Sequence, residues 1–288
     1  MYQWFVAASP LTRSDSTGLP SGLALSPELA AQCVLDTHRT VAFLRGIAAA
    51  IEEAHRRFDG VLEVVYAGTG PFAPLAIPLM PLPRVHFTLI DIHDAATSNV
   101  RQLLDRLGLH ASVVRADATT YEHPSPIHIV ITETMQRALQ KEPFVAVTRN
   151  LRRQLAPRGV LIPERVTVDF ALIDPAAEQA RWNGAAIPPH HERLATVAEI
   201  TADRELMEPM EVTIPRDGQW PALLTRVDVF GDAKIDDYES GLTMPEVLWH
   251  LAPSRAGNII RIEPKDLELI AAYMNDCQTG NHGADSGS

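Results

Sequence analysis

The sequence has little lysine and little cysteine. Only three of its 25 basic residues are lysines, Lys141, Lys234 and Lys265, and 36 acidic residues give a formal net charge of −11. A nucleic-acid-binding surface needs a surplus of basic residues that displaces counterions, so this balance argues against nucleic acid as a partner. Cys33 and Cys277 are the only cysteines, which excludes a disulfide framework and favours the reducing cytoplasm as the location.

Several other signatures are missing. No apolar run approaches the roughly 20 residues of a membrane span, and the first residues lack the charged segment of a secretory signal. The histidines form no HExxH or HxxxH pattern, so no metal is expected. A GxSxG elbow, a complete GxGxxG fingerprint and a Walker lysine are also absent, which disfavours a hydrolase, an NAD-dependent oxidoreductase and a nucleotide triphosphatase.

What is present is a globular composition, with 46% hydrophobic residues in a chain of 288. Four segments follow from local composition. Residues 1–25 are rich in Ser, Gly and Pro and predict a loose N-terminal arm, whereas 26–163 alternate short apolar runs with helical patterns. Residues 164–275 predict a smaller β-rich region, and the polar residues 276–288 predict a disordered tail.

The alternation in the second segment predicts βαβ units and a parallel sheet, and therefore an α/β fold. Ligands of such sheets bind at the carboxyl ends of the strands. Strands are expected at 61–67, 85–92, 112–115, 127–132 and from 160, with helices at 26–58, 72–80, 95–107 and 144–155; the β-rich region adds strands at 166–173, 211–214 and 223–230.

The first predicted strand ends in a turn with two glycines. Tyr66, Ala67, Gly68, Thr69 and Gly70 follow one another there. Glycines let a ligand approach the backbone closely, beside the N–H groups that begin the next element. A plain tight turn explains the same residues equally well.

Aspartates end the next two strands. Asp91 stands about 20 residues beyond the glycines, where an acid accepts hydrogen bonds from ribose hydroxyls. Asp94 is a neighbour that can substitute for it, and a helix N-cap is the alternative role for either. Asp117 follows the third strand and can accept from an adenine amino group, or it is an ordinary loop aspartate.

Two glutamates follow the fourth strand. Glu133 stands at its carboxyl end and Glu142 nine positions later, which is too far for one helical face. Only a loop or hairpin can bring the two carboxylates together, and together they would bind a cation or a guanidinium. Spacing alone favours a solvated Glu142 that pairs with an arginine.

Of three further features, two keep two interpretations each. Asp36 and Arg39 are one helical turn apart and form a surface ion pair, unless the helix folds over the sheet and brings Arg39 to a ligand carboxylate. His190 and His191 are adjacent, so their side chains point apart. Residues 236–243 are polar with one aromatic, and they either line a small-molecule pocket or form a surface turn.

Together these segments resemble class I S-adenosylmethionine (SAM) methyltransferases, and specifically the protein arginine methyltransferase branch. Residues 61–71 resemble the family's glycine motif, and 155–168 resemble its LxPxGxxxP passage. Residues 35–40 resemble its N-terminal helix, whose arginine holds the SAM carboxylate. The family's double-E pattern, E-x-M-x-x-x-L-x-x-E, is met by Glu133, Met135, Leu139 and Glu142. The likeness covers roughly residues 30–170.

The resemblance implies a Rossmann-like methyltransferase sheet followed by a partial β-barrel, with SAM as the cofactor. Glu133 and Glu142 would be catalytic. The cofactor contacts that it implies are Arg39, Tyr66, Ala67, Gly68, Gly70, Asp91, Asp117 and Glu133.

The sequence also departs from the family pattern. Tyr66 stands where the motif has its first glycine, the preceding acid is displaced to Glu63, and His128 stands where the fourth strand often has Asp. No Thr-His-Trp loop is present, with Trp249-His250 as the nearest pair, and the β-rich region is short. These departures favour a biosynthetic N-methyltransferase of a small guanidino or amino compound over an enzyme that modifies proteins.

Other functions stay open. Transfer or cyclisation of the aminocarboxypropyl arm of SAM is chemically possible, and a protein arginine methyltransferase remains an alternative. If the ring of Tyr66 fills the cofactor site, the chain is a non-catalytic binding partner. The apolar N-terminal arm is compatible with a homodimer.

Overall fold

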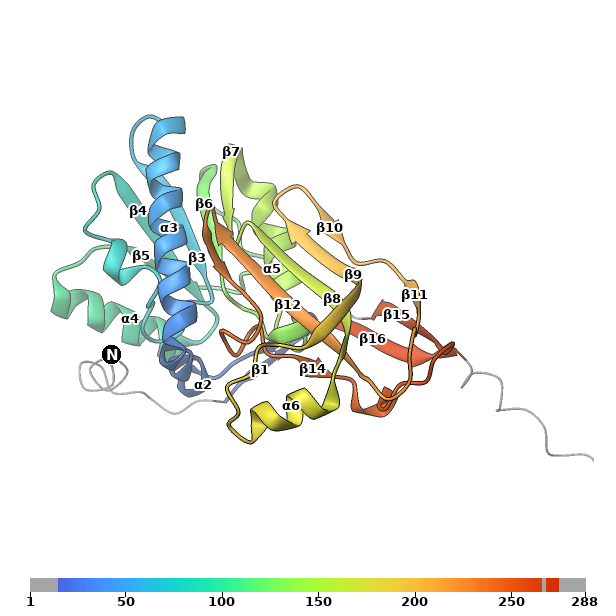
Figure 1. The fold of residues 1–288 in the computed structure, drawn as a ribbon. Coiled ribbons are helices and arrows are strands. Elements are labelled where there is room, and N and C mark those ends of the chain that lie inside the picture. The colour runs from blue at the N-terminus through green and yellow to red at the C-terminus, as the bar shows by residue number, and fades with distance from the viewer. Residues whose placement is uncertain (1–14, 266–267, 275–288) are drawn as a thin grey trace, which may run out of the picture.

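The computed structural model describes residues 15–265 and 268–274. A parallel sheet and an antiparallel region lie side by side, and the long helix α3 (Thr37–Arg57) packs against both (Figure 1). The chain passes from one region to the other between β7 (Leu155–Ile162) and β8 (Arg165–Ile173). Within the described ranges, no helix is both long enough and apolar enough to cross a membrane.

The parallel sheet has the five strands that the sequence predicts, in the order β5-β4-β3-β6-β7. The other four strands are β3 (Leu62–Ala67), β4 (Val85–Asp91), β5 (Ser112–Arg115) and β6 (Ile127–Thr132). Helices α3 and α4 (Asp94–Leu107) cover one face, and α5 (Phe144–Leu151) covers the other. Burial on both faces explains why these strands are almost continuously apolar.

The antiparallel region contains more strands than the three that the sequence predicts. One sheet has the order β10-β9-β8-β12-β13, with β14 also paired to β12, and a second has the order β11-β15-β16. The strands are β9 (His191–Thr201), β10 (Glu205–Leu206), β11 (Met210–Thr213), β12 (Trp220–Phe230), β13 (Ala233–Ile235), β14 (Glu246–Val247), β15 (Ile259–Lys265) and β16 (Glu268–Tyr273). Helix α6 (Pro175–Trp182), which was not predicted, lies between β8 and β9.

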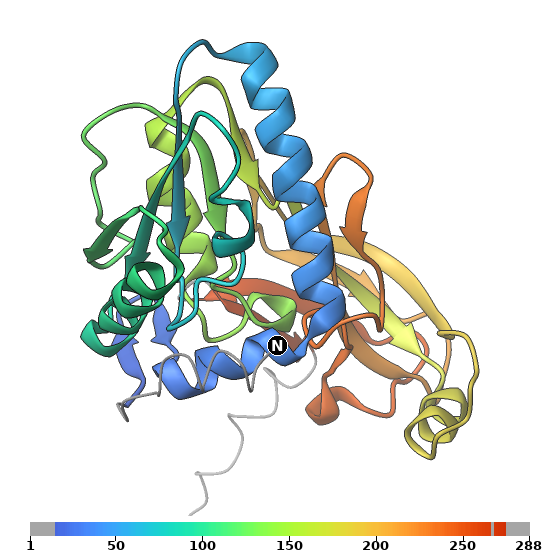
Figure 2. The ribbon, with the colours of Figure 1, turned by 90° about the vertical axis from the view of Figure 1, so that its left-hand side faces the viewer.

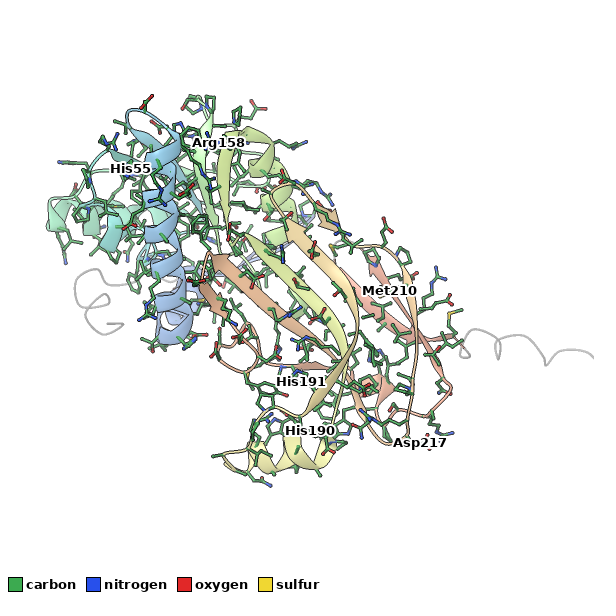
Figure 3. All side chains as sticks on the ribbon, turned by 45° about the horizontal axis from the view of Figure 1, so that its top comes forward. His55, Arg158, His190, His191, Met210 and Asp217 are labelled. Carbon is green, nitrogen blue, oxygen red and sulfur yellow. The ribbon has the colours of Figure 1, made fainter. Side chains whose placement is uncertain are left out.

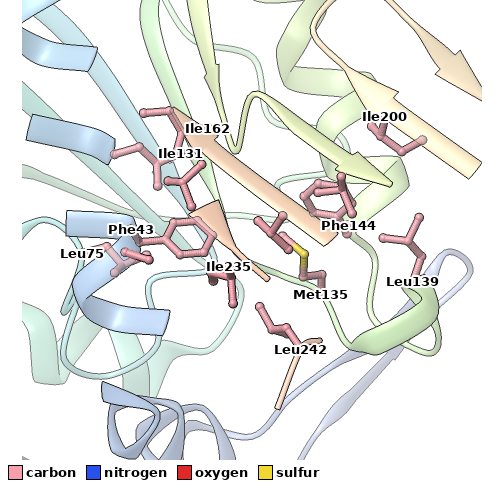
Figure 4. Packing of buried hydrophobic residues seen from close by; sticks show 14 of the residues in the cluster. Phe43, Leu75, Ile131, Met135, Leu139, Phe144, Ile162, Ile200, Ile235 and Leu242 are labelled. Carbon is pink, nitrogen blue, oxygen red and sulfur yellow. The ribbon is translucent and has the colours of Figure 1, made fainter. Parts of the chain in front are cut away.

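One hydrophobic core joins the two regions. Phe43 of α3 and Ile131 of β6 lie in the same buried cluster as Ile235 of β13 (Figure 4). Helix α3 approaches β12 closely at Gly46, where an added Cβ would lie 2.5 Å from Cγ1 of Val229. A larger residue at this position would push the helix away from the sheet, so the glycine fixes the distance between the two regions.

The predicted helix 26–58 is wrong as a single element. It is divided into α2 (Pro27–Gln32), a 3₁₀ turn (Cys33–Leu35) and α3. Asp36 leaves the helical region at ψ 83°, and its Oδ1 accepts a hydrogen bond from the backbone N–H of Arg39 at 3.1 Å. This aspartate therefore caps a new helix, which places Arg39 in its first turn.

The predicted helix at 72–80 is also wrong. Only a 3₁₀ turn, Ile77–Leu79, is present there. Prolines at positions 71, 74, 78 and 81 remove the N–H donors that a continuous α-helix needs. The segment instead follows an irregular path whose apolar side chains, such as Phe72 and Leu75, enter the core.

The N-terminal arm is only in part as predicted. Residues 1–14 and the predicted tail 276–288 lie outside the described residues. From residue 15 on, the arm is not loose, because β1 (Thr17–Leu19) and β2 (Gly22–Ala24) form an antiparallel hairpin around Pro20 and Ser21. The hairpin and α2 lie across the carboxyl ends of the parallel strands (Figure 2).

Candidate active site

A cavity lies at the carboxyl ends of the parallel strands, beneath the β1–β2 hairpin. The structure brings eight of the nine predicted site residues to its wall. They are Arg39, Tyr66, Gly68, Gly70, Asp91, Asp117, Glu133 and Glu142. The ninth, Ala67, has no exposed surface, and its side chain belongs to the cluster on the α5 face of the sheet.

The glycine loop and the end of β4 form one unit. Gly68 has φ +71°, and an added Cβ would lie 2.2 Å from Cγ2 of Thr134, so only glycine fits. The N–H of Gly68 donates to the carbonyl oxygen of Ile90 at 2.9 Å, and the N–H of Gly70 donates to Oδ2 of Asp91 at 2.9 Å. The loop is therefore fixed to the carboxylate that the sequence singled out.

The aspartates at the strand ends differ in their surroundings. Asp91 is buried, and its Oδ1 accepts a hydrogen bond from the N–H of His93 at 2.9 Å. Asp117 makes a turn in which its Oδ1 accepts from the N–H of Thr119 at 2.8 Å. Asp94 is exposed in the first turn of α4 and does not line the cavity. The N-cap of α4 is His93, so neither Asp91 nor Asp94 caps that helix.

Tyr66 does not fill the cavity. Its ring is buried on the α3 face of β3, and about 110 Å³ of space remains beside it. That is room for several water molecules. Burial, with the negative charge of Glu133 second, raises the pKa of the phenol well above its usual range. Tyr66 is therefore a neutral hydroxyl at the cavity wall.

Arg39 turns into the sheet instead of pairing with Asp36 on the surface. Its Nη1 donates to Oε1 of Glu133 at 3.0 Å and its Nη2 donates to the carbonyl oxygen of Cys33 at 2.9 Å. The arginine side chain is 10% exposed and that of Glu133 11%. Burial alone would lower the pKa of Arg39, but the charge of Glu133, together with Cys33 and Asp36, outweighs burial and raises that pKa.

Both predicted catalytic glutamates have raised pKa values. Burial raises the pKa of Glu133 to about 7, although the charge of Arg39 opposes the shift. Burial, and then the charge of Glu133, raises the pKa of Glu142 to about 8. The solvated role that spacing favoured for Glu142 is therefore wrong. A bound cation would lower both pKa values again, because it stabilises the charged carboxylates.

The double-E segment brings its two acids together by a tight path after β6. Ala138, Leu139 and Lys141 all have left-handed backbone, with φ of 58°, 55° and 62°. The N–H of Ala138 donates to Oγ1 of Thr225 in β12 at 2.7 Å, and Leu139 is buried in the core. The antiparallel sheet thus holds the segment in a conformation that few non-glycine residues adopt.

A second cavity, called the outer cavity below, adjoins the first, which is called the inner cavity. Leu25, Cys33, Arg39, Glu133 and Glu142 line both, so the two acids stand at the border. The outer cavity is also lined by part of the double-E segment and by a loop and a strand of the antiparallel region: Met135, Gln136, Arg137, Gln140, Lys141, Gly241, Leu242 and Glu246.

The polar segment 236–243 belongs to this wall. Oδ2 of Asp36 accepts hydrogen bonds from Oγ of Ser240 at 2.6 Å and from the N–H of Gly241 at 3.0 Å. The aspartate that caps α3 therefore also holds the loop in place. Sequence reasoning missed Asp36 in this role, although the Asp-Thr-His-Arg pattern of a helix start was visible.

The β1–β2 hairpin closes the first cavity from above. Oγ1 of Thr17 lies 3.1 Å from Nε2 of His93, and the N–H of Leu23 donates to the carbonyl oxygen of Lys141 at 2.5 Å. Leu19 and Leu25 line the cavity itself. The hairpin thus connects the β4 end to the double-E segment, which the sequence did not indicate.

Two features that the sequence singled out, His190-His191 and Trp249-His250, do not line either cavity. His190 and His191 are near the start of β9, beside α6 (Figure 3). Trp249 is 57% exposed, and its ring packs against those of Trp182 and Trp220, while Nε2 of His250 lies 2.7 Å from the carbonyl oxygen of Ala271. In the described part of the chain, no three His, Cys, Asp or Glu residues are grouped as a metal site.

No family model and no curated protein matches the sequence. Among solved structures, the Trypanosoma brucei PRMT1 enzyme–prozyme heterotetrameric complex with AdoHcy is similar, with a TM-score of 0.60 and 13% identity. The similarity covers 87% of this chain and 94% of that one. The chain has the fold of a protein arginine methyltransferase. This fold includes both the parallel sheet and the antiparallel region, because the match extends over most of both chains.

Proposed function

We propose that the protein is a SAM-dependent N-methyltransferase that acts on a small guanidino or amino compound. One observation carries the proposal. The partly ionised pair of Glu133 and Glu142 stands at the border of two adjoining cavities, one built on a glycine loop and the other lined by the double-E segment. A methyl donor in the first cavity and a nitrogen acceptor in the second would meet at these carboxyls.

The residues that line the inner cavity are of the types that would bind SAM. Oδ2 of Asp91 accepts one backbone hydrogen bond and keeps a lone pair for a ribose hydroxyl, whereas Oδ1 accepts one and also lies 3.3 Å from Nδ1 of His93. Gly68 leaves the backbone open to a close approach, and Asp117 lies where an adenine amino group is expected. Arg39 would hold the methionine carboxylate. The similar T. brucei structure contains AdoHcy, the product of methyl transfer from SAM, which supports this choice.

Bound SAM supplies an electrophilic methyl group on a positively charged sulfur. The task of the protein is therefore placement, which can lower a barrier by roughly 7–11 kcal/mol. Glu133 orients the acceptor so that a nitrogen lone pair points at the methyl carbon. As the new N–C bond forms and the C–S bond breaks, Glu142 accepts the proton that the nitrogen loses. Its raised pKa of about 8 suits a proton acceptor near neutral pH.

The proposal is tested by incubating the protein with methyl-labelled SAM and a panel of free amino acids, amines and basic peptides. Label in a small acceptor with AdoHcy as the co-product is the expected result, measured by mass spectrometry. Methylthioadenosine as the co-product would instead indicate use of the aminocarboxypropyl arm. Label only in peptides would indicate a protein arginine methyltransferase. No heat of SAM binding in a calorimetric titration would leave a non-catalytic partner.

We also propose that the protein forms a homodimer. The rings of Trp182 of α6 and Trp249 pack against each other, and the two residues are 48% and 57% exposed. An exposed apolar patch is typical of an interface, and a dimer of identical subunits uses the same patch on both chains. Light scattering after size-exclusion chromatography should show a dimer, and Trp182→Ser should give a monomer. The exposed Leu107→Ser in α4 is the control and should leave the dimer intact.

A further inference from the structure

The outer cavity is lined by charged groups of both signs. The carboxyls of Glu133 and Glu142 stand at its border with the inner cavity. Arg137 lines the same cavity with its ion-pair partner Glu246, and the arginine side chain is 47% exposed. A ligand that contacts both groups therefore meets two carboxyls at one place and a guanidinium, paired with one carboxylate, at the other.

One of the three guanidinium nitrogens of Arg137 is hydrogen-bonded to the described part of the protein, and the other two are available to a ligand. Its Nε donates to Oε2 of Glu246 in β14 at 2.5 Å. Among the residues that the structure describes, no hydrogen bond engages its Nη1 or Nη2. A guanidinium presents its N–H groups as a planar fork that fits a carboxylate. With Nε anchored, the Nη groups are oriented but free to bind an anionic group at the cavity mouth.

The spacing limits the length of the ligand. Glu133 and Arg137 are four residues apart, so their Cα atoms are separated by at most roughly 14 Å even in an extended chain. One small molecule with a cationic nitrogen at one end and a carboxylate at the other meets both requirements.

We propose that the acceptor is a free α-amino acid with a terminal guanidinium or ammonium, whose α-carboxylate binds Arg137 while its terminal nitrogen lies between Glu133 and Glu142. This inference rests on the proposed function and narrows its substrate class. An arginine within a peptide has amide groups in place of the α-carboxylate, so it gives Arg137 no anionic partner. Glu142 takes a proton from the terminal nitrogen, and for an ammonium this happens before attack, because an ammonium has no lone pair. Methyl transfer then breaks the C–S bond of SAM and forms the N–C bond, and the proton stays on Glu142.

Three pairs of compounds test the inference, because each pair differs only in the carboxylate. They are arginine and agmatine, ornithine and putrescine, and lysine and cadaverine. Binding is measured by calorimetry in the presence of AdoHcy, and kcat/KM with labelled SAM. For at least one pair, the amino acid should bind about tenfold or more tightly than its decarboxylated partner, which is about 1.4 kcal/mol.

The variant Arg137→Met should remove this preference. It should weaken amino-acid binding about tenfold and leave binding of the matching amine within about twofold. Arg106→Met changes an exposed arginine of α4 and should change neither. Arg137→Lys keeps the charge without the fork and should recover part of the preference.

The outcomes separate this inference from the proposed function. The inference is overturned if Arg137→Met weakens binding of the amino acid and of the matching amine equally. It is also overturned if the unchanged protein binds the amines more tightly than the amino acids. The inference is overturned as well if none of the three amino acids binds. Carboxylate-dependent binding without methyl transfer would support the inference and overturn the proposed function.

Discussion

Two clusters of buried charge lie in different regions of the molecule, and they differ in how they are balanced. The active-site cluster consists of Arg39, Glu133 and Glu142, with one cation for two acids. The sheet cluster, in the antiparallel region, has two acids, Asp169 and Asp237, with two cations, Arg193 and Arg226, and also contains His191. The two clusters contain similar residue types, so their differences show how surroundings decide the role of a carboxylate.

In the sheet cluster every acid is well supplied with donors. Nε of Arg193 donates to Asp169 at 2.7 Å, and its Nη2 donates to Asp237 at 2.6 Å. Oγ1 of Thr196 donates to Asp169 at 2.7 Å. Burial alone would raise the pKa of Asp237, but hydrogen bonds from His191 and Arg193 outweigh burial and hold it well below its usual range.

In the active-site cluster the pKa values of the acids move in the opposite direction. Burial raises those of Glu133 and Glu142, and the single cation Arg39 offsets only part of the shift. A cluster that lacks positive charge is suited to bind a cation, whereas a balanced cluster is suited to hold strands together. The comparison makes predictions that differ for the two clusters.

The largest effect is expected at Glu133. Glu133→Gln should lower kcat by about 100-fold or more, because the acceptor nitrogen loses its orienting carboxylate. The Kd for SAM should stay within about threefold, measured by calorimetry. Glu208→Gln, at an exposed acid, is the control and should change neither value. Unchanged turnover in Glu133→Gln would remove the catalytic role from this cluster.

Arg193→Met should affect stability instead of catalysis. It removes the cation that Asp169 and Asp237 share, although Asp169 keeps Arg226 and Asp237 keeps His191, so we expect a loss of about 1.5–3 kcal/mol and not that of a fully unpaired buried charge. Urea unfolding measures the loss. Arg216→Met removes an exposed partner of Glu192 and should cost at most about 1 kcal/mol. If both variants lose the same free energy of unfolding, the sheet cluster does not stabilise the antiparallel region as its contacts indicate.

The pH dependence of kcat/KM should report the active-site cluster. A cationic acceptor needs both carboxylates ionised, so kcat/KM should fall about tenfold per unit below about pH 8 and about 100-fold per unit below about pH 7. Glu142→Gln should remove the step that belongs to the group with a pKa of about 8. The profile reports the coupled pair and not either acid alone. A profile that is flat from pH 6 to pH 9, an interval that includes both values, would contradict the raised pKa values.

Stability should depend on pH through Glu142. Its pKa is about 8 in the folded protein and 4.5 as a free side chain, so the folded state binds more protons between these values. Stability therefore falls as the pH rises through this window. Glu142→Gln removes that loss, so at pH 8.5 its Tm should exceed that of the unchanged protein by a few degrees. At pH 4 the two should agree, and scanning calorimetry in the absence of ligand measures both.

The smallest effect is expected at the loop of the outer cavity. Ser240→Ala removes a hydrogen bond to Asp36 and should cost about 1–2 kcal/mol of stability. KM for the acceptor should rise more than kcat falls, because Gly241 and Leu242 line the outer cavity. Thr119→Ala, which loses a hydrogen bond to Asp117, should leave the acceptor KM unchanged.

The parallel sheet could be predicted from the sequence, because its strands are short apolar runs separated by amphipathic helices. The same reasoning missed β9 and α6, because neither contains a long apolar run and the apolar residues of β9, such as Leu194 and Val197, are separated by polar or small ones. It also missed the helix break at Asp36, although this residue carries a recognisable N-cap pattern. The antiparallel strands depend on pairing with distant partners, which local sequence does not encode.

The candidate site was partly predictable for a similar reason. Asp91 and Glu133 follow apolar strands, so their place at one edge of the sheet follows from topology. The approach of Glu142 depends on left-handed backbone at Ala138 and Lys141, residues that give no sign of it in the sequence. The resemblance to a double-E hairpin supplied what spacing could not.

The hairpin over the inner cavity has a consequence for the timing of each turnover. It is attached at two points, through Thr17 to His93 and through Leu23 to Lys141. A spent cofactor beneath it departs only after at least one of these attachments separates. The interval between successive reactions then includes the waiting time for that separation, which depends on residues that never touch the reacting atoms.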